Sequence, residues 1–350
     1  MSKKNALTFS AELPLVSVVI PMRNEAQHID RCIRSLIQQD YPKNLYEILV
    51  VDGMSKDHSK KIIQSLSNSY SNIFFLENPN LLTSFGLNAG IRKSKAETII
   101  ILGAHSFVVP DFIRRNVEVL KNSGADCVGG PINSLGETYV ASTISLAMSS
   151  QFGVGDALFR YAESEGYVDT VAFGAYKRTV FKEIGLFDEE LVRDQDDELN
   201  YRLRKAGGKI FISPQIKSFY YNQANLRKLW IQYLLYGFWK IRVLQKHPKM
   251  MQLRQFAPAC FVLSIALSSV GSLYFPILFS LLLSILMSYI VTNIFFSFRI
   301  TRKEGWKYLP LLPVVFSTLH LSYGMGFLAG LIKFISKWFQ DEPEPPRLIE

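Results

Sequence analysis

Two long apolar runs occupy the C-terminal part of the chain. No Asp, Glu, Lys, Arg or His occurs in residues 256–298, and the second run, 308–332, is interrupted only by His320. As a helix, the first run would be roughly 60 Å long, which is about two crossings of a bilayer. A buried helical hairpin in a soluble protein is the alternative interpretation. The pattern predicts a membrane region over residues 256–335, with helices at about 256–274, 276–298 and 308–332.

The charges around these runs predict their orientation. The segment RITRKEGWK, residues 299–307, is rich in Lys and Arg, and short loops of this kind stay on the cytoplasmic side. The opening MSKKNALTFSAEL has no apolar run long enough for a signal peptide. We therefore expect a multi-pass protein of the cell membrane, with its N-terminal domain in the cytoplasm and its tail, residues 336–350, outside.

Short β-rich runs alternate with amphipathic helical stretches in residues 15–222, after a tail of residues 1–14. In the clearest helical stretch, 26–39, the apolar side chains recur on one face. Such alternation, with nearly continuous apolar strands, predicts an α/β domain whose mostly parallel sheet is covered on both faces. The expected strands lie at 17–21, 47–52, 73–78, 97–103 and 126–132.

The segment between the two regions, residues 223–250, mixes basic and aromatic side chains. Its central part reads LRKLWIQYLLYGFWKIRVLQKH. Basic residues beside amphipathic aromatics, just before a membrane helix, favour a helix that lies among the lipid headgroups. Nucleic-acid binding is the alternative for the same charges. The closeness of the apolar runs favours the membrane.

Composition excludes several classes of protein. The chain has 350 residues, 39 Lys+Arg against 30 Asp+Glu, and a net charge of +9. With 48% hydrophobic and 20% charged residues it is not a disordered chain. Its three cysteines, Cys32, Cys127 and Cys260, are far apart, so a disulfide scaffold and a cysteine-built zinc site are excluded.

Polar motifs follow the expected strands. PMRNE begins at Pro21, DGMSKDHS begins at Asp52, NPNLLTSFGLNAGIRKS contains Asn88, and GAHS begins at Gly103. Ligands bind at the carboxyl ends of the strands in parallel α/β sheets, so a nucleotide could lie across these motifs. Taken singly, each motif could also be a turn followed by a helix cap.

The ordered set PMRNE, DGMSKD, GAH, GAYKR, GLFDE and DQDDELNYRLRKAG resembles glycosyltransferase family 2, with the GT-A fold. The resemblance covers about residues 14–247 and is strongest in 168–210. There the chain is similar to the succinoglycan-type exopolysaccharide glycosyltransferases, which also carry C-terminal membrane helices.

The resemblance implies a site for a nucleotide-sugar donor, with a UDP-type nucleotide. It implies that Asp52 holds the base, although Asp52 could also be a turn former. For Arg23 and Glu25 the alternative is a surface ion pair. The expected donor-binding residues are Pro21, Arg23, Glu25, Asp52, Asp57 and Asn88.

The family carries Asp-x-Asp at the end of the fourth strand, where carboxylates bind Mg²⁺ or Mn²⁺. This chain departs from that pattern, with Gly103 in the first position and His105 in the last. The resemblance implies a divalent cation, Mn²⁺ or Mg²⁺, held in part by His105. The alternative is a histidine that only hydrogen-bonds the diphosphate or a loop.

The last motif, Asp194 to Glu198, matches a family pattern whose aspartate is the general base, which here is Asp196. Acidic residues in the first turn of a helix also suit the helix dipole, so a structural cap is the competing interpretation. Asp197 and Glu198 then support the helix. The residues expected around the acceptor are Gly174, Tyr176, Gln195 and Asp197.

Together these features predict an inverting glycosyltransferase at the membrane. The expected acceptor is lipid-linked, such as a polyprenyl-diphosphate oligosaccharide of a surface polysaccharide or exopolysaccharide. The partners expected are the donor, this acceptor, the membrane and other polysaccharide assembly proteins, with no nucleic acid. The alternatives are a polyprenyl-phosphate sugar synthase and a catalytically silent membrane scaffold.

Overall fold

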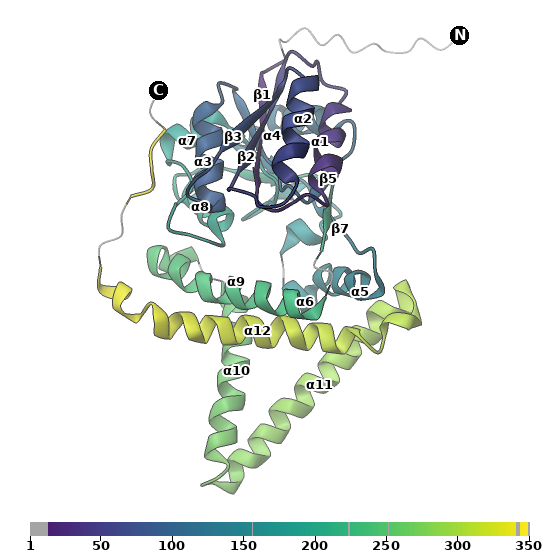
Figure 1. Ribbon diagram of the computed structural model, residues 1–350. Coiled ribbons are helices and arrows are strands. Elements are labelled where there is room, and N and C mark those ends of the chain that lie inside the picture. Colours follow the sequence, from purple (N-terminus) through teal and green to yellow (C-terminus); the bar gives the residue numbers. More distant parts are fainter. Residues whose placement is uncertain (1–12, 156, 223–224, 251, 341–343, 349–350) are drawn as a thin grey trace.

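The computed structural model describes residues 13–155, 157–222, 225–250, 252–340 and 344–348. Most of the expected N-terminal tail, 1–14, lies outside the described residues. An α/β domain stands on a layer of helices, and two further helices project from the other side of that layer (Figure 1).

The α/β domain is built on an eight-stranded sheet with the order β3-β2-β1-β4-β9-β6-β10-β8. Pairing is parallel from β3 through β4, with Val18 opposite Ile48 in the β1–β2 register, while β9 enters antiparallel to both of its neighbours. The mostly parallel α/β fold predicted from the sequence is thus confirmed. The strands are β1 (Val16–Met22), β2 (Tyr46–Asp52), β3 (Ile73–Glu77), β4 (Thr98–Ile101), β6 (Cys127–Gly129), β8 (Gly166–Tyr167), β9 (Ala175–Lys177) and β10 (Ile210–Ile212).

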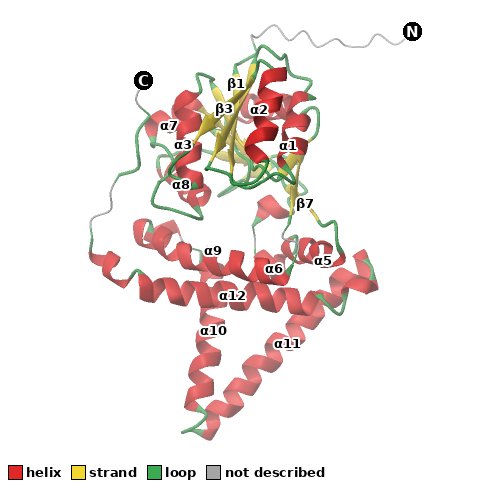
Figure 2. Ribbon diagram, viewed as in Figure 1, coloured by secondary structure: helices red, strands yellow, loops and turns green. Residues whose placement is uncertain are grey.

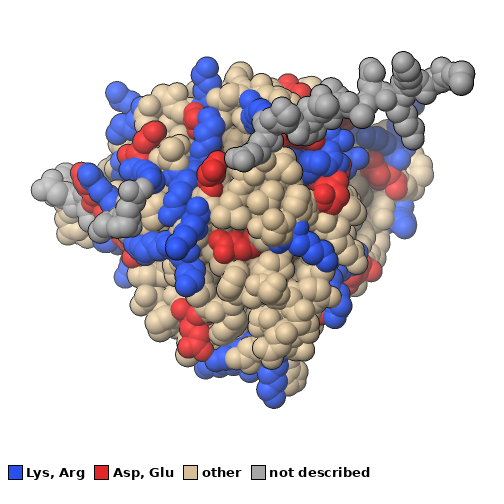
Figure 3. Space-filling view, turned by 90° about the horizontal axis from the view of Figure 1, so that it is seen from above, with Lys and Arg blue, Asp and Glu red and all other residues tan. Residues whose placement is uncertain are grey.

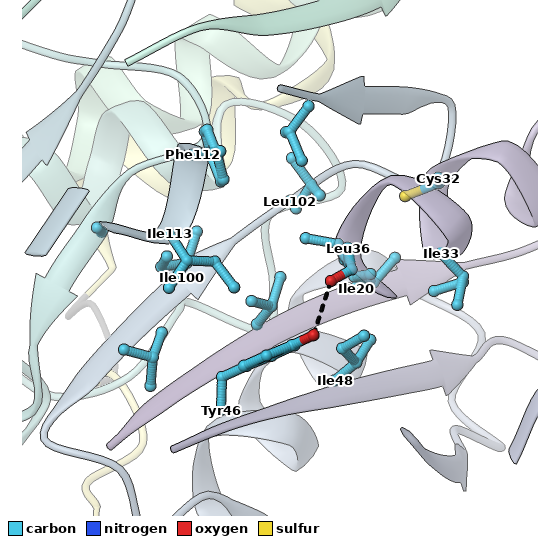
Figure 4. Packing of buried hydrophobic residues seen from close by; sticks show 14 of the residues in the cluster. Ile20, Cys32, Ile33, Leu36, Tyr46, Ile48, Ile100, Leu102, Phe112 and Ile113 are labelled. Atoms are coloured by element: carbon cyan, nitrogen blue, oxygen red, sulfur yellow. Dashed lines mark hydrogen bonds between the residues drawn. The ribbon is translucent and has the colours of Figure 1, made fainter. Parts of the chain in front are cut away.

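Helices cover both faces of this sheet and close two hydrophobic cores. On one face the apolar side of α1 packs against β1 and β2, where the Tyr46 hydroxyl donates to the Leu36 carbonyl over 2.9 Å (Figure 4). The second core lies under α3, α7 and α8. The helices are α1 (Ile29–Ile37), α2 (Ser59–Ser69), α3 (Thr83–Lys93), α4 (Phe112–Ser123), α7 (Arg178–Glu183) and α8 (Gln195–Lys205).

A second sheet connects the domain to the helical layer. It has the order β5-β11-β7, with β5 (Ser106–Val108), β7 (Ile132–Leu135) and β11 (Ser218–Tyr221). The single strand expected at 126–132 is therefore two strands, β6 and β7, in different sheets. The backbone passes so close to Ile216 at Gly130 that a Cβ there would lie 1.8 Å from the Ile216 carbonyl oxygen. This break leads the chain out of the main sheet toward the helices.

The helical layer is formed by two long helices that run side by side, with α5 and α6 beside them (Figure 2). Glycines allow the close approach of α9 and α12: a Cβ on Gly237 would lie 2.1 Å from the Tyr323 carbonyl oxygen, and one on Gly326 2.0 Å from that of Leu234. The helices are α5 (Tyr139–Met148), α6 (Gln151–Val154), α9 (Leu226–Lys246) and α12 (Leu312–Lys333).

The projecting hairpin consists of α10 (Leu253–Gly271) and α11 (Pro276–Glu304), which meet at their far ends (Figure 1). Large apolar side chains such as Leu273, Ile277 and Val291 are exposed along it. The α/β domain differs: seen from above, Lys, Arg, Asp and Glu are interspersed over its surface (Figure 3). Among the described helices, α11 and α12 are long and apolar enough to cross a membrane.

Residues 344–348 of the C-terminal tail lie against the α/β domain. The expectation that the tail and this domain are on opposite sides of the membrane is therefore wrong. The Leu186 N–H donates to the Pro346 carbonyl over 2.7 Å, and Leu348 joins the second core. The topology expected from the sequence treated α12 as a membrane crossing that does not pack against the rest of the protein. Instead α12 is half buried beside α9, and His320, which interrupts its apolar run, contacts the Phe152 carbonyl of α6 through Nε2 at 2.8 Å.

Candidate active site

A cavity of about 760 Å³ runs from the strand ends of the α/β domain to the helical hairpin. Pro21 and Gly103 line it at the sheet, and Asp196 lies in its wall. At the other end it reaches Pro258 of α10 and Tyr289 of α11. A polar site and a membrane-type hairpin therefore share one continuous space.

The two strand-end loops after β1 and β2 are tied to each other by hydrogen bonds. The Asp57 carboxylate accepts from the N–H of Ala26 over 3.0 Å, and the Ser59 hydroxyl accepts from the N–H of Glu25 over 2.8 Å. Burial raises the pKa of Asp57, but the hydrogen bonds from Ser59 and Ala26 outweigh it and lower that pKa. The Asp57 carboxylate therefore already accepts hydrogen bonds that join the two loops. Its contact with a donor stays a prediction.

Asp52 also has a structural role. Its buried carboxylate accepts from the Ser55 hydroxyl over 2.5 Å and from the Ser55 N–H. This geometry supports the turn-forming alternative, and contact with a nucleotide base stays a prediction. Arg23 is exposed beside Gly53. Within the described residues no ion pair joins Arg23 to Glu25.

The prediction that Asn88 contacts the donor is wrong. Asn88 is fully buried on α3, and its amide donates to the Phe187 carbonyl over 2.9 Å and to Glu189 over 2.8 Å. Its oxygen accepts from the Phe187 N–H over 2.9 Å. With both ends of the amide engaged, Asn88 fastens the GLFDE segment to α3. The sequence could not reveal this role because the partner lies about a hundred residues away.

Glu25 lies beside His105, and not beside Arg23 as the alternative of a surface ion pair would require. The His105 Nδ1 is 3.1 Å from a Glu25 carboxylate oxygen, and the imidazole packs edge-on against the Tyr220 ring. Among the described residues, no group of three or more His, Cys, Asp or Glu side chains could hold a metal ion. In that part of the chain, side chains alone therefore do not form a complete site for a resident cation.

The start of α8 presents Asp196 to the cavity. Asp194 adopts a left-handed conformation with φ 60°, after which the helix begins. The Asp196 side chain is exposed to the cavity and accepts from the N–H of Asp197 over 3.0 Å. Enclosure by protein, together with the charges of Asp197 and Asp194, raises the pKa of Asp196 to about 6. A carboxylate of this kind can accept a proton near neutral pH.

Lys240 of α9 holds the carboxylates on either side of Asp196. Its ammonium lies 2.9 Å from Asp194 and 2.8 Å from Asp197, and the side chain is buried. Burial raises the pKa of Asp197, but the Lys240 charge outweighs this and lowers it. Asp197 also accepts from the Thr170 hydroxyl over 3.1 Å. The expected supporting role of Asp197 agrees with these contacts.

The sequence-based placement of the basic side chains of α9 among lipid headgroups is wrong for three of them. Lys240, Arg242 and Lys246 face the α/β domain: Arg242 pairs with Glu190 over 2.8 Å, and Lys246 with Asp188 over 2.6 Å. Arg227 and Lys228, at the start of α9, are exposed. The buried cations find acidic partners that are distant in sequence, so the sequence pattern alone could not distinguish them.

The residues expected around the acceptor surround Asp196. Gly174, Tyr176 and Gln195 line the cavity. The Tyr176 hydroxyl donates to Asn200 over 2.9 Å, and burial raises its pKa well above the usual value. Glu198 pairs with Arg202 over 2.7 Å, as the helical spacing predicts. Arg160 also lines the cavity, and no sequence motif indicated it.

The α/β domain has the GT-A fold. A solved structure with this fold, the mannosyltransferase PcManGT from Pyrobaculum calidifontis in complex with GDP-Man and Mn²⁺, aligns with a TM-score of 0.59 at 15% identity, over 92% of this chain and 88% of that one. At this identity the likeness concerns the fold.

Sequence comparison identifies the family. Residues 17–185 match the model for glycosyl transferase family 2. The dolichyl N-acetyl-alpha-D-glucosaminyl phosphate 3-beta-D-2,3-diacetamido-2,3-dideoxy-beta-D-glucuronosyltransferase of Methanococcus voltae is 31% identical over 91% of this chain and 97% of its own length. Succinoglycan biosynthesis protein ExoA of Rhizobium meliloti (strain 1021) is 28% identical over 91% and 95%. The chain belongs to glycosyltransferase family 2 and is a glycosyltransferase.

Proposed function

We propose that this glycosyltransferase moves a sugar from a nucleotide-diphosphate donor to a lipid-linked acceptor at a membrane, with inversion at the anomeric carbon. The proposal rests on one observation. Asp196 lies in a continuous cavity, between the strand ends and the α10–α11 hairpin. A polar donor and an apolar carrier can enter such a space from opposite ends.

In the proposed reaction Asp196 is the general base. An acceptor hydroxyl gives its proton to the Asp196 carboxylate while its oxygen attacks the anomeric carbon from the side opposite the nucleotide. The bond from the anomeric carbon to the diphosphate oxygen breaks, and the electron pair leaves with the nucleoside diphosphate. A base with a pKa of about 6 is ionised at neutral pH yet basic enough to accept the proton.

The donor site is proposed at the strand ends, with Pro21, Arg23, Glu25 and Asp52 around a nucleotide such as UDP. Among solved structures of similar fold, TarS of S. aureus is in complex with UDP, and PcManGT is in complex with GDP-Man and Mn²⁺. A divalent cation neutralises a departing diphosphate when it is bound. Since His105 and Glu25 alone do not complete a metal site, we propose that the cation arrives with the donor.

The lipid-linked acceptor is supported by the helices and by the relatives. The Methanococcus voltae enzyme is named for a dolichyl-phosphate-linked sugar, and ExoA for succinoglycan biosynthesis. We propose that the acceptor belongs to a surface polysaccharide, exopolysaccharide or protein-linked glycan, and that other assembly proteins act beside this enzyme. A catalytically silent scaffold would not need a carboxylate exposed in a cavity.

For the membrane arrangement we propose that the α10–α11 hairpin inserts and that α9 and α12 lie at the cytoplasmic surface. A tail packed on the α/β domain requires an even number of crossings. In intact cells, an outside-restricted thiol reagent should modify neither a cysteine at Pro345 nor one at Lys303. Modification at Pro345 alone would restore the three-crossing topology.

The function is tested with the full chain in lipid nanodiscs, labelled UDP- and GDP-sugars and a lipid extract from the source cell. We expect label in the lipid fraction and a loss of roughly 10²-fold or more for Asp196→Asn. Asp126→Asn is the matched control, because Asp126 pairs with Lys177 away from the cavity. Transfer by Asp196→Asn at the wild-type rate would make Asp196 a helix cap. Product formed on bare lipid phosphate would favour a polyprenyl-phosphate sugar synthase.

A further inference from the structure

Arg160 places a positive charge in the cavity wall, without an acidic partner in the part of the chain that the structure describes. It ends a short 3₁₀ turn, Leu158–Arg160, and lines the cavity. Its Nη1 is buried and has no hydrogen-bond partner, and no carboxylate among the described residues pairs with the guanidinium. A cation withdrawn from water in this way is costly unless an anion completes its hydrogen bonds.

The other cations of the cavity differ from Arg160. Lys240 is neutralised by Asp194 and Asp197. Arg204 also has a buried nitrogen, Nε, without a hydrogen-bond partner, but it lies over the Tyr201 ring at 6.0 Å on α8, and its charge lowers the pKa of Asp197. Arg160 has an aromatic neighbour, Phe159, and among the described residues no such acid. It is therefore the cation best placed to bind an anionic ligand among the described cavity residues.

The surroundings of Arg160 lead toward the membrane side of the cavity. The Arg160 charge acts on the phenols of Tyr220 and Tyr233, lowering pKa values that burial raises. Tyr233 belongs to α9, and both tyrosines line the cavity. Phenol hydroxyls beside a guanidinium are suitable donors to phosphoryl oxygens.

An apolar passage continues from this point to the surface of the hairpin. Phe152, Phe261 and Tyr289 line both the main cavity and a second groove of about 470 Å³. The groove opens onto α11 at Ile285 and Ser288, in the part of the molecule where α10 and α11 diverge (Figure 2). One end of the passage thus carries the Arg160 cation, and the other opens where lipid would be.

We propose that Arg160 binds the phosphoryl group of a lipid-phosphate acceptor, whose hydrocarbon chain leaves the cavity past Phe152, Phe261 and Tyr289 and between α10 and α11. This deepens the proposed function and rests on it, because it assigns the acceptor's binding site. The donor diphosphate is the other source of a phosphoryl group. We favour the acceptor because the cavity that Arg160 lines continues into the groove on α11, and the proposed nucleotide residues are at the strand ends.

Binding of farnesyl phosphate, with farnesol and UDP as comparison ligands, tests the site in the full chain in nanodiscs. We expect Arg160→Gln to weaken farnesyl phosphate by about 10-fold or more, the scale of a charge-assisted hydrogen bond, and to leave farnesol and UDP unchanged. Arg160→Lys should retain part of the affinity. Arg178→Gln is the matched control, because Arg178 also has a buried, unpartnered Nη1 but does not line the cavity.

A second variant tests the passage without altering the cation. Ser288→Trp should fill the groove and weaken farnesyl phosphate and farnesol alike, whereas Met287→Trp, on the exposed neighbouring position outside the groove, should not. Arg160→Gln weakening UDP alone would assign Arg160 to the donor. Unchanged farnesyl phosphate binding in Arg160→Gln and Ser288→Trp would overturn the site.

The outcomes separate this inference from the proposed function. If the wild-type enzyme transfers sugar to lipid but does not bind farnesyl phosphate, the Arg160 site is wrong and the function stands. If farnesyl phosphate binds in an Arg160-dependent manner while no lipid acceptor receives sugar, the site stands and the proposed function is wrong.

Discussion

The strand-end loops and the α8–α9 junction both surround the cavity, yet they are held by different means. The loops are joined by short polar side chains, Asp57 and Ser59 of one loop, which accept hydrogen bonds from backbone N–H groups of the other loop in the same α/β domain. At the junction, Lys240 reaches Asp194 and Asp197 from a helix more than forty residues away. The loops are fixed by contacts within the α/β domain, whereas the electrostatics of the proposed base depend on docking of the helical layer.

The largest effect we expect is the dependence of transfer on Asp196 ionisation. The pKa of Asp196 is raised to about 6, so the base becomes protonated as the pH falls through 6. Transfer should fall about tenfold per pH unit below that value, and by more than 10²-fold by about pH 4 if folding is retained. The groups that face Asp196 are Asp194, Asp197 and Lys240. Steady-state rates with circular dichroism at each pH measure this, and a flat profile would contradict the assignment.

Lys240→Met should break the junction. Removing one partner of a buried ion pair costs about 3–5 kcal/mol, because Asp194 and Asp197 remain charged. Since the Lys240 charge lowers the pKa of Asp196, its loss should raise that pKa and move the acid limb of the activity profile to higher pH.

The control for this junction is Lys240→Arg, which keeps the charge and should keep the limb near pH 6. Thermal unfolding in nanodiscs and rate profiles report the two effects separately. A stability loss without any movement of the acid limb would show that Lys240 only packs α9 against the domain.

His105→Ala tests the strand-end region for a cation carried by the donor. We expect Mn²⁺ to support transfer better than Mg²⁺, and the variant to lose that preference with most of the activity, because neutral imidazole suits Mn²⁺ better. Glu25→Gln, which keeps the size of the His105 partner, is the comparison variant. Full activity in excess chelator, unchanged in His105→Ala, would contradict the cation.

Gly103→Asp is a second test of the cation carried by the donor. A Cβ at Gly103 would lie 3.1 Å from the Phe173 ring, so the ring must shift by a few tenths of an ångström. Once accommodated, the added carboxylate should lower the Mn²⁺ concentration needed for half-maximal transfer. A higher requirement would show that Gly103 is needed for packing against Phe173.

The smallest effect belongs to the loop ties. Asp57→Ala removes the acceptor for the Ala26 and Ser59 N–H groups and should cost about 1 kcal/mol, as for a lost helix cap. Urea unfolding measures it, with Asp30→Ala on the exposed face of α1 as control. A loss as large as that of Lys240→Met would remove the distinction between the two regions.

Residue order alone determined the parts of this protein that depend on neighbours in sequence. Alternating apolar strands and amphipathic helices specified the α/β sheet, and strand-end motifs specified where the site lies, because parallel strands bring their carboxyl ends to one edge. Glu198 and Arg202 are one helical turn apart, which is the spacing that favours the ion pair seen in the structure. The uncharged length of 256–298 was enough to indicate a hairpin.

Tertiary structure alone decided which polar groups meet across long separations. Asn88 has an amide that could hydrogen-bond a ligand, but packing buries it against Phe187. The charges of α9 suit a membrane surface, but three of them turn inward because acids of the α/β domain neutralise them there. Pro346 of the tail returns to Leu186, and no carboxylate among the described residues pairs with Arg160, because such pairings depend on the distance between side chains in the folded chain.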